Sequence, residues 1–364
     1  MVRYTKMHDT KRKYLNVYVA NNSGVPSDIT IQQQFNESFI QNPSEYCCSV
    51  VKFSLSTTSI PILLSQTAQS TSRSVIVCYQ DVGGNFHSEE VFLIFYDSGY
   101  DGVGRYDYNQ YEFGQIIQSI NNAYATAFTN LSGFGLPNHP PVFSIGTNGL
   151  LSVTLHSSII NMLNSASNSI YPNFVVGEML YIGVNRGCRG WFDYFDAYDI
   201  NAVASPFPAN LSQIIYFGNN LNPGTQTLTQ YRSSYDNIRD VTNIIITSSL
   251  PVVPEYLPLY TVYSNSQIIN TNATSDASLN ILSEYSLLGS ENRSTSVQIY
   301  LPTAEFRRTQ LQGTVPISSV RFAVFYLSAG DPSEIQPKLY PMKINPNSIF
   351  DMKILFEKNI ATGS

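Results

Sequence analysis

The stretch SIFDMKILFEKN, residues 348–359, alternates strictly between apolar and polar side chains. On one side of an extended chain fall Phe350, Met352, Ile354 and Phe356, and on the other fall Asp351, Lys353 and Glu357. A period of two residues is typical of a β-strand that buries one face. We therefore expect a strand here that is paired into a sheet.

The same alternation recurs elsewhere in the chain. It predicts strands at residues 51–55, 75–79, 89–97, 239–249, 297–301 and 320–326. With the strand at 348–359, the count approaches the eight strands of a double Greek-key jelly roll, in which two antiparallel sheets pack face to face.

Helix is scarce. One helix is predicted over residues 110–127, where apolar side chains recur at helical spacing, as is typical of core packing. They are Phe113, Ile116, Ile117, Ile120 and Tyr124. Asn109 and Glu112 form the capping pair expected at its start. A second, weaker helix is predicted over residues 278–288.

The segment NIIITSSLPVVPEYLP, residues 243–258, begins as a strand and then loses the ability to pair. Pro251, Pro254 and Pro258 succeed one another within eight residues. Proline has no amide hydrogen to give to a sheet and fixes φ near −65°. The strand should therefore stop sharply. The proline-containing part is then either an extended segment that reaches a neighbouring molecule or an ordinary loop over the end of the sandwich.

The middle of the chain differs from both ends, because short strands there are separated by Asn- and Ser-rich turns. We therefore predict an all-β fold, an antiparallel jelly-roll β-sandwich with an inserted β-rich subdomain that contains one helix. Residues 1–45 would form a basic N-terminal arm and an extended lead-in. Residues 46–97 and 236–364 would form the jelly roll, and residues 98–235 the insertion.

The composition is poor in charge and rich in aromatic side chains. Charged residues make up 13% of the chain, against about 25% in an average soluble protein, and there are 25 Tyr and 20 Phe. Two interpretations remain open. Much of the surface could be buried against other proteins, since interface cores lose charge and gain aromatics, or the composition could simply be that of a β-rich chain.

The few charges are unevenly placed. Five basic residues lie within the first 14 positions, opposed only by Asp9: Arg3, Lys6, Lys11, Arg12 and Lys13. The whole chain carries −6, so the remainder carries −10. A basic arm on an acidic body is expected to meet another surface, and a solubilising terminus is the alternative. Because the arm lacks apolar periodicity, residues 1–13 are expected to lie outside the folded core.

No arrangement of residues predicts catalysis. The four histidines and four cysteines show no metal-ligand or redox spacing, and no nucleotide-binding or hydrolase motif occurs. We expect no enzyme activity, metal, cofactor or small-molecule substrate. We also expect no transmembrane segment, because no apolar run approaches the roughly 20 residues that span a bilayer. The N-terminus shows no apolar segment of a secretory signal.

Two further interpretations centre on WFDYFDAYD, residues 191–199. Trp191 could stack on a sugar while Asp193 and Asp196 hold its hydroxyls, as in a protein that binds a glycan or a receptor. Paired carboxylates at this spacing could also perform acid–base chemistry on a glycan. A polar loop anchored by its aromatic residues is the simpler interpretation, and we favour it.

Several segments together resemble the minor capsid, or penton, proteins of virophages and Polinton-like viruses. They are NIIITSSLPVVPEYLP (243–258), ILSEYSL (281–287), VQIYLPTAEFRRTQLQG (297–313), FAVFY (322–326), SIFDMKILFEKN (348–359) and SVVKFSLSTTSIPIL (49–63), with the helix at 110–127. The resemblance covers about two thirds of the chain, and residues 130–235 match least.

The resemblance implies a structural protein of the virion. It implies a jelly-roll penton subunit that forms homopentamers at the fivefold vertices of an icosahedral capsid, with an insertion between the third and fourth jelly-roll strands. The implied partners are the major capsid protein and, for the N-terminal arm, packaged DNA. Synthesis and assembly would take place in the host cytoplasm or virus factory. The alternative function is a jelly-roll attachment protein that binds a receptor or glycan.

Overall fold

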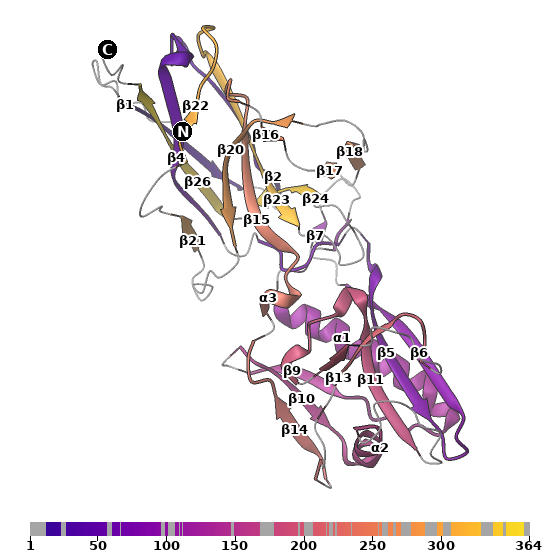
Figure 1. Ribbon diagram of the computed structural model, residues 1–364. Helices are drawn as coiled ribbons and strands as arrows, with labels where there is room; N and C mark the ends of the chain where they lie inside the picture. Colours follow the sequence, from indigo (N-terminus) through magenta and orange to yellow (C-terminus); the bar gives the residue numbers. More distant parts are fainter. Residues whose placement is uncertain are drawn as a thin grey trace.

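The structure is a computed structural model with two lobes at opposite ends of the molecule (Figure 1). It describes residues 12–359 except for 23–26, 57–59, 66, 96–98, 101–105, 109, 111, 147–148, 168–177, 196, 200–206, 216, 218–220, 223, 234, 254, 257–260, 265–266, 271–277, 288–296, 301–306, 329–337 and 345–346. The first and last described strands both lie in the lobe that is uppermost in Figure 1.

The upper lobe is a sandwich of two sheets. The first, called here the β1 sheet, contains in spatial order β1 (Arg12–Ala20), β26 (Ile349–Lys358), β4 (Tyr46–Ser56) and β21 (Val297–Tyr300), with β22 (Thr309–Gln310) also paired to β4. The second, the β15 sheet, contains β3 (Thr30–Gln34), β23 (Ser319–Ser328), β15 (Val241–Ser248) and β20 (Ile281–Ser286). It is extended beyond β23 by β24 (Lys338–Pro341), β17 (Thr261–Ser264) and β18 (Gln267–Asn270).

The eight principal strands have the connectivity of a double Greek-key jelly roll. Numbered along the chain, they lie in the orders 1-8-3-6 and 2-7-4-5. Every pairing among these eight strands is antiparallel. The predicted jelly-roll fold class is therefore confirmed.

The alternation in residues 348–359 is confirmed as the pattern of a half-buried strand. Phe350, Met352, Ile354 and Phe356 are at most 1% exposed and lie in the core between the two sheets. From the facing sheet, β23 contributes Val320, Phe322, Val324 and Tyr326. Burying each such side chain stabilises the fold by about 1.5–3 kcal/mol, so this core holds the sandwich together.

The lower lobe has its own core, made of two sheets and three helices. The larger sheet contains, in order, β12 (Ala197–Asp199), β13 (Leu211–Ile215), β11 (Met179–Asn185), β5 (Gln69–Gln80) and β6 (Phe86–Ile94). The smaller contains β14 (Gln226–Thr229), β10 (Leu151–Leu155) and β9 (Val142–Ile145). The helices are α1 (Phe113–Leu131), α2 (Ser157–Ser167) and α3 (Tyr235–Ile238), and none of the described helices is long and apolar enough to cross a membrane.

Short elements complete the described chain. They are the pairs β2 (Ser27–Asp28) with β25 (Lys343–Ile344), β7 (Gly99–Tyr100) with β8 (Tyr106–Asp107), and β16 (Glu255–Tyr256) with β19 (Ser278–Leu279), and the 3-10 turns 43–45, 132–134, 186–188 and 193–195.

The strand pairing differs from the predicted division of the chain at residue 97. β5 and β6 were expected in the jelly roll, but β5 pairs with β11, and its Val75 and Val77 lie in the lower core together with α1. The third jelly-roll strand is β4, and the lower lobe is inserted between β4 and β15. β1 and β3, which fall within the predicted arm and lead-in, complete the jelly roll. Alternation identifies a strand, but it does not identify the strand's partner.

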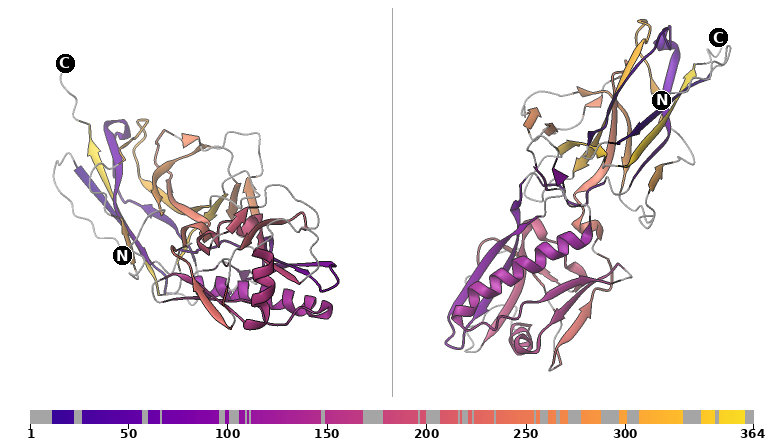
Figure 2. Two further views of the ribbon diagram at one scale, coloured as in Figure 1. Left: turned by 60° about the horizontal axis from the view of Figure 1, so that its bottom comes forward. Right: turned by 180° about the vertical axis from the view of Figure 1, so that it is seen from behind.

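Helix α1 lies across the larger sheet of the lower lobe (Figure 2). Its apolar stripe is confirmed, since Ile116, Ile120 and Tyr124 are at most 1% exposed. The helix begins at Phe113, after an N-cap at Glu112 whose N–H donates to the Gln115 side chain (3.4 Å). The predicted capping partner Asn109 lies outside the described residues.

The predicted helix over residues 278–288 is wrong. Strand β20 occupies this segment and pairs with β15. Ile281, Leu282 and Tyr285 are at most 3% exposed. Their burial against the neighbouring strands outweighs the helical spacing of the sequence, because helix propensity is a weak preference that packing can override.

The two lobes meet where the chain leaves the jelly roll and where it returns. On the way out, Ile60 and Leu64 lie in the jelly-roll core, whereas Ile62 and Leu63 lie in the core of the lower lobe. On the return, Asp240 donates its N–H to the Ile62 carbonyl (2.9 Å) and accepts the Leu64 N–H with its carboxylate (3.1 Å). The outgoing and returning segments are therefore hydrogen-bonded to each other.

Candidate assembly surface

The predicted basic arm leads directly into the jelly roll. Arg12 and Lys13 are the first residues of β1 and pair with Glu357 and Phe356 of β26. These two residues are therefore continuous with the jelly roll, because their backbones belong to the β1 sheet, although neither side chain is part of the buried core. Arg3, Lys6 and Lys11, the other predicted partner-binding cations, lie outside the described residues.

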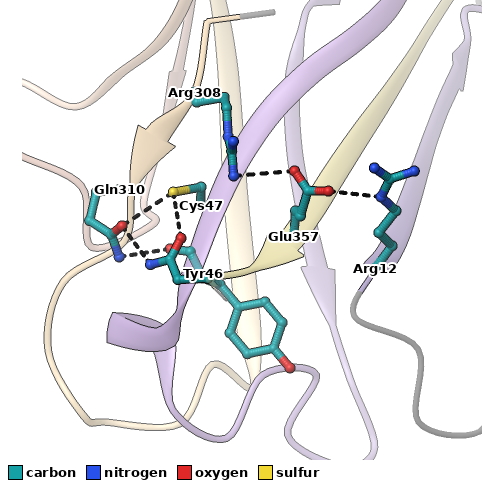
Figure 3. A network of polar contacts seen from close by, with 7 residues as sticks. Arg12, Tyr46, Cys47, Arg308, Gln310 and Glu357 are labelled. Carbon is teal, nitrogen blue, oxygen red and sulfur yellow. Dashed lines mark hydrogen bonds and ion pairs between the residues drawn. The ribbon is translucent and has the colours of Figure 1, made fainter. Parts of the chain in front are cut away.

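Glu357 holds two arginines at this end of the β1 sheet (Figure 3). Its carboxylate lies 2.8 Å from Arg12 Nε and 3.2 Å from Arg308 Nη2. The hydrogen bond and the negative charge of Glu357 raise the pKa of Arg12. Both arginine side chains remain more than half exposed, at 62% and 55%. One carboxylate beside two guanidinium groups leaves a net positive charge directed towards solvent.

A second set of contacts ties the end of β26 to the start of β4 (Figure 3). The Gln310 side-chain amide donates to the carbonyls of Ser44 (2.9 Å) and Tyr46 (3.0 Å). Its own oxygen accepts from the Asn359 side chain (2.8 Å) and lies 3.2 Å from Cys47 Sγ. These bonds fix the end of the sheet from which the arm extends.

The outer face of the β1 sheet carries exposed aromatic rings. Tyr14 and Tyr18 of β1 are 49% and 52% exposed, and Lys353 Nζ lies 4.6 Å from the centre of the Tyr14 ring. Lys52 forms an ion pair with Asp351 (3.1 Å) on the neighbouring strands. Aromatic side chains and Arg are enriched at protein interfaces, and Tyr is a frequent anchor there.

Strand β1 is also an edge of its sheet. It pairs with β26 on one side, and no described strand pairs with its other side. An edge strand of nine residues presents backbone groups that a second chain can use. Tyr14 and Tyr18 are not among the residues predicted to contact a partner, although the alternation in KYLNVYVA (13–20) places both of them on the outer face of a strand.

Of the three predicted prolines, the structure describes Pro251. Its carbonyl accepts the N–H of Gln312, and Val252 forms an isolated bridge with Leu311. The chain after β15 is thus held, at this point, against its own β22 region. Pro254 and Pro258 lie outside the described residues.

The predicted glycan contact at Trp191 is contradicted by its burial. Trp191 is 2% exposed within the lower core, with the Arg73 guanidinium 6.0 Å from its ring. Such a ring cannot stack on a sugar from solvent. Asp193 is exposed and accepts a hydrogen bond from the Gln213 side chain, as expected for a polar loop. Asp196 lies outside the described residues.

The described part of the chain contains no cluster of metal-binding side chains. Its residues include no group of three or more His, Cys, Asp or Glu side chains placed to hold a metal ion. Burial raises the pKa of the Cys48 thiol to about 12 and also raises that of Cys78. These thiols are therefore protonated and unreactive at neutral pH.

The fold and this surface define a class of protein: a jelly-roll subunit with an inserted lobe, an exposed edge strand and a positively charged terminus. The family model described as Sputnik minor capsid protein V18/19 matches residues 13–80 and 94–358. Because this match spans most of the chain, the chain belongs to the Sputnik minor capsid protein V18/19 family. It is a virophage minor capsid protein, a structural component of the virion.

Solved structures share the fold over nearly the whole chain. A chain from "The 3.5 A resolution structure of the Sputnik virophage by cryo-EM" matches with a TM-score of 0.68 and 20% identity, covering 96% of this chain and 98% of that one. The "Crystal structure of SeMet-labeled mavirus penton protein" matches with a TM-score of 0.64 and 17% identity, covering 96% and 100%. A comparison with curated protein sequences finds no match.

Proposed function

We propose that this chain forms homopentamers that close the fivefold vertices of an icosahedral capsid, with the major capsid protein as its neighbour. The observation that carries the proposal is end-to-end similarity: a penton structure is matched along its entire length, including the inserted lobe. A ring of five requires heterologous contacts, in which two different patches of each subunit meet around a closed cycle. Synthesis and assembly in the host cytoplasm or virus factory belong to the same proposal.

The outer face and free edge of β1 supply one of the two patches. Tyr14 and Tyr18 offer apolar area, and the edge of β1 that pairs with no described strand offers directional hydrogen bonds. Burying exposed aromatic rings of this kind is a frequent source of interface energy. The predicted role of Pro254 and Pro258 in holding an extended segment towards a neighbour stays part of the proposal, whereas Pro251 contacts its own chain.

The arm is proposed to bind acidic partners. Arg3, Lys6 and Lys11 precede Arg12 in the sequence and add to the positive charge of Arg12 and Arg308. Packaged DNA and acidic faces of neighbouring capsid proteins are the surfaces that such a segment would meet in a capsid. Binding to phosphates releases counterions, so it should weaken steeply as salt rises.

A matched pair of variants tests the contact surface. Tyr18→Glu places a charge on the outer face of β1 and should shift the protein from pentamers to monomers in light scattering. Tyr231→Glu makes the same change at a 68% exposed site on the lower lobe and should leave the pentamer intact. Pentamers that survive Tyr18→Glu, with an unchanged dissociation constant, would rule out this face as the subunit contact.

A further inference from the structure

Much of the lower lobe is built from uncharged sequence. Residues 113–177 and residues 200–231 contain no Asp, Glu, Lys or Arg, although charged residues make up 13% of the chain. These stretches supply α2, β10 and β14, which lie at the end of the lobe away from the jelly roll in Figures 1 and 2. The histidines within them are His139 and His156.

The small sheet β9–β10–β14 presents one face to solvent. Its other face is buried, since Phe143, Leu151 and Val153 are at most 2% exposed. Cross-strand register places the outward side chains in two rows, Ser144–Ser152–Thr229 and Val142–Thr154–Thr227. We call these six residues the hydroxyl face, because five of them end in a hydroxyl group.

The hydroxyls of this face are paired across the strands. Ser152 Oγ lies 2.8 Å from Thr229 Oγ1, and Thr154 Oγ1 lies 3.1 Å from Thr227 Oγ1. Each hydroxyl has one donor and two acceptor positions, so a paired hydroxyl still has hydrogen-bonding capacity for a ligand. Thr227 and Thr229 are exposed. The pairs therefore hold ordered, uncharged donors and acceptors towards solvent.

An aromatic residue continues the outward side of β14. After Thr229 the chain points Gln230 inward, where it is 1% exposed, and turns Tyr231 outward, where it is 68% exposed. The Tyr231 ring packs edge-on against the Tyr194 ring, with 5.3 Å between ring centres. The backbone N–H of Tyr231 donates to the backbone carbonyl of Tyr194 (3.4 Å). An exposed ring held in place at the edge of a hydroxyl surface suits the apolar C–H face of a sugar.

We propose that the hydroxyl face with Tyr231 is a binding site for a neutral glycan. A polyol can exchange hydrogen bonds with hydroxyls in both directions, and it carries no charge that would need a counter-charge. A polyanion would find no cation among the six residues. The six residues of the hydroxyl face offer a protein partner few anchors, because Ser, Thr and Val are under-represented among the residues that dominate interface energy.

This inference rests on the proposed function, because the capsid shell and the pentamer determine where the glycan site lies and how many copies of it are present. If the jelly roll forms the shell, the far end of the lower lobe is the part of the subunit best placed to meet a surface outside it. A pentamer presents five copies of the site, so weak single contacts gain strength through multivalency.

The test uses the purified full chain and an array of immobilised neutral polysaccharides (mannan, galactan, dextran and xylan), with heparin and polysialic acid as charged probes. We expect binding to at least one neutral polysaccharide that changes little between about 50 and 200 mM salt, in contrast to ion-driven binding. Thr229→Lys and Tyr231→Ser should each weaken it about tenfold or more, because each removes a hydrogen-bonding or stacking partner. Thr126→Lys, at an exposed position of α1, is the matched control and should bind as the unmodified protein.

Three outcomes overturn the proposal: no binding to any neutral polysaccharide, binding to the charged probes alone, or undiminished binding by Thr229→Lys and Tyr231→Ser. Light scattering on the same samples separates this result from the oligomer question. Intact pentamers that do not bind neutral glycans would contradict the glycan site but not the proposed capsid role. Glycan binding by a chain that forms no pentamer would contradict the vertex proposal.

Discussion

The guanidinium of Arg73 lies 2.6 Å from the carboxylate of Asp240, and both side chains are largely buried, at 7% and 11% exposure. Arg73 belongs to β5 of the inserted lobe, and Asp240 directly precedes β15 of the jelly roll. Because the Asp240 carboxylate also accepts the N–H of Leu64, one carboxylate joins the segments that leave and re-enter the jelly roll. The ion pair therefore lies at the junction of the two lobes.

Asp240→Asn should destabilise the protein by about 3 kcal/mol, because it leaves the Arg73 charge buried without its counter-charge. Replacing both residues, as Arg73→Met with Asp240→Leu, should recover much of that loss, since a buried pair can often be exchanged for apolar side chains. Urea denaturation of the single and double variants provides the measurement. A cost below about 1 kcal/mol for Asp240→Asn would show that the pair does not hold the junction.

Two truncations should show that the residues needed for stability begin at residue 12. Deleting residues 1–11 should leave the melting temperature nearly unchanged and reduce incorporation into capsids. Deleting residues 1–13 should also lower the melting temperature, because it removes two paired residues of β1 and the hydrogen bond from Lys13 Nζ to the Phe39 carbonyl (2.8 Å). Thermal denaturation of the two truncated proteins is the comparison. Equal melting temperatures would contradict the role assigned to Arg12 and Lys13.

Thiol labelling should find one accessible cysteine among four. Cys47 is half-buried, whereas Cys48, Cys78 and Cys188 are buried. Since the thiolate is the reactive form, and the pKa of Cys48 is raised to about 12 by burial, Cys48 should stay unlabelled as the pH rises from 7 to about 9. Peptide mass spectrometry after iodoacetamide treatment of the native protein identifies the site. Rapid labelling of Cys48 or Cys78 would mean that the β-sheets open readily.

Trp191→Ala should lower the free energy of unfolding. Removing a side chain that is 2% exposed from the lower core should cost about 3–5 kcal/mol. Asp193→Asn, at an exposed position two residues away, should change the denaturation midpoint little. A Trp191→Ala protein as stable as the unmodified one would contradict the buried placement of this ring.

The sequence predicted some parts of this fold and could not predict others, for physical reasons. The burial of Phe350 and Ile354 can be deduced from local alternation, and so can the stripe that contains Ile116 and Ile120. The strand that pairs with β5 cannot be deduced in this way, because Val75 and Val77 would show the same apolar–polar alternation in either lobe. Pairing depends on contacts between residues far apart in sequence, which a single sequence does not display.

The candidate surface shows the same limit. The charge of Arg12 can be read from the sequence. Its place in β1 cannot, because the strand forms by pairing with β26, where Arg12 lies opposite Glu357 near the other end of the chain. Trp191 looked like a binding residue because aromatic side chains serve both cores and binding sites. Its burial separates the two interpretations.

The central claim is that five copies of this chain form a closed ring. Negative-stain images of the purified full-length protein at high concentration, together with native mass spectrometry, test it most directly. We expect fivefold rings and a mass five times that of the 40.6 kDa chain. Stable dimers or trimers would contradict it.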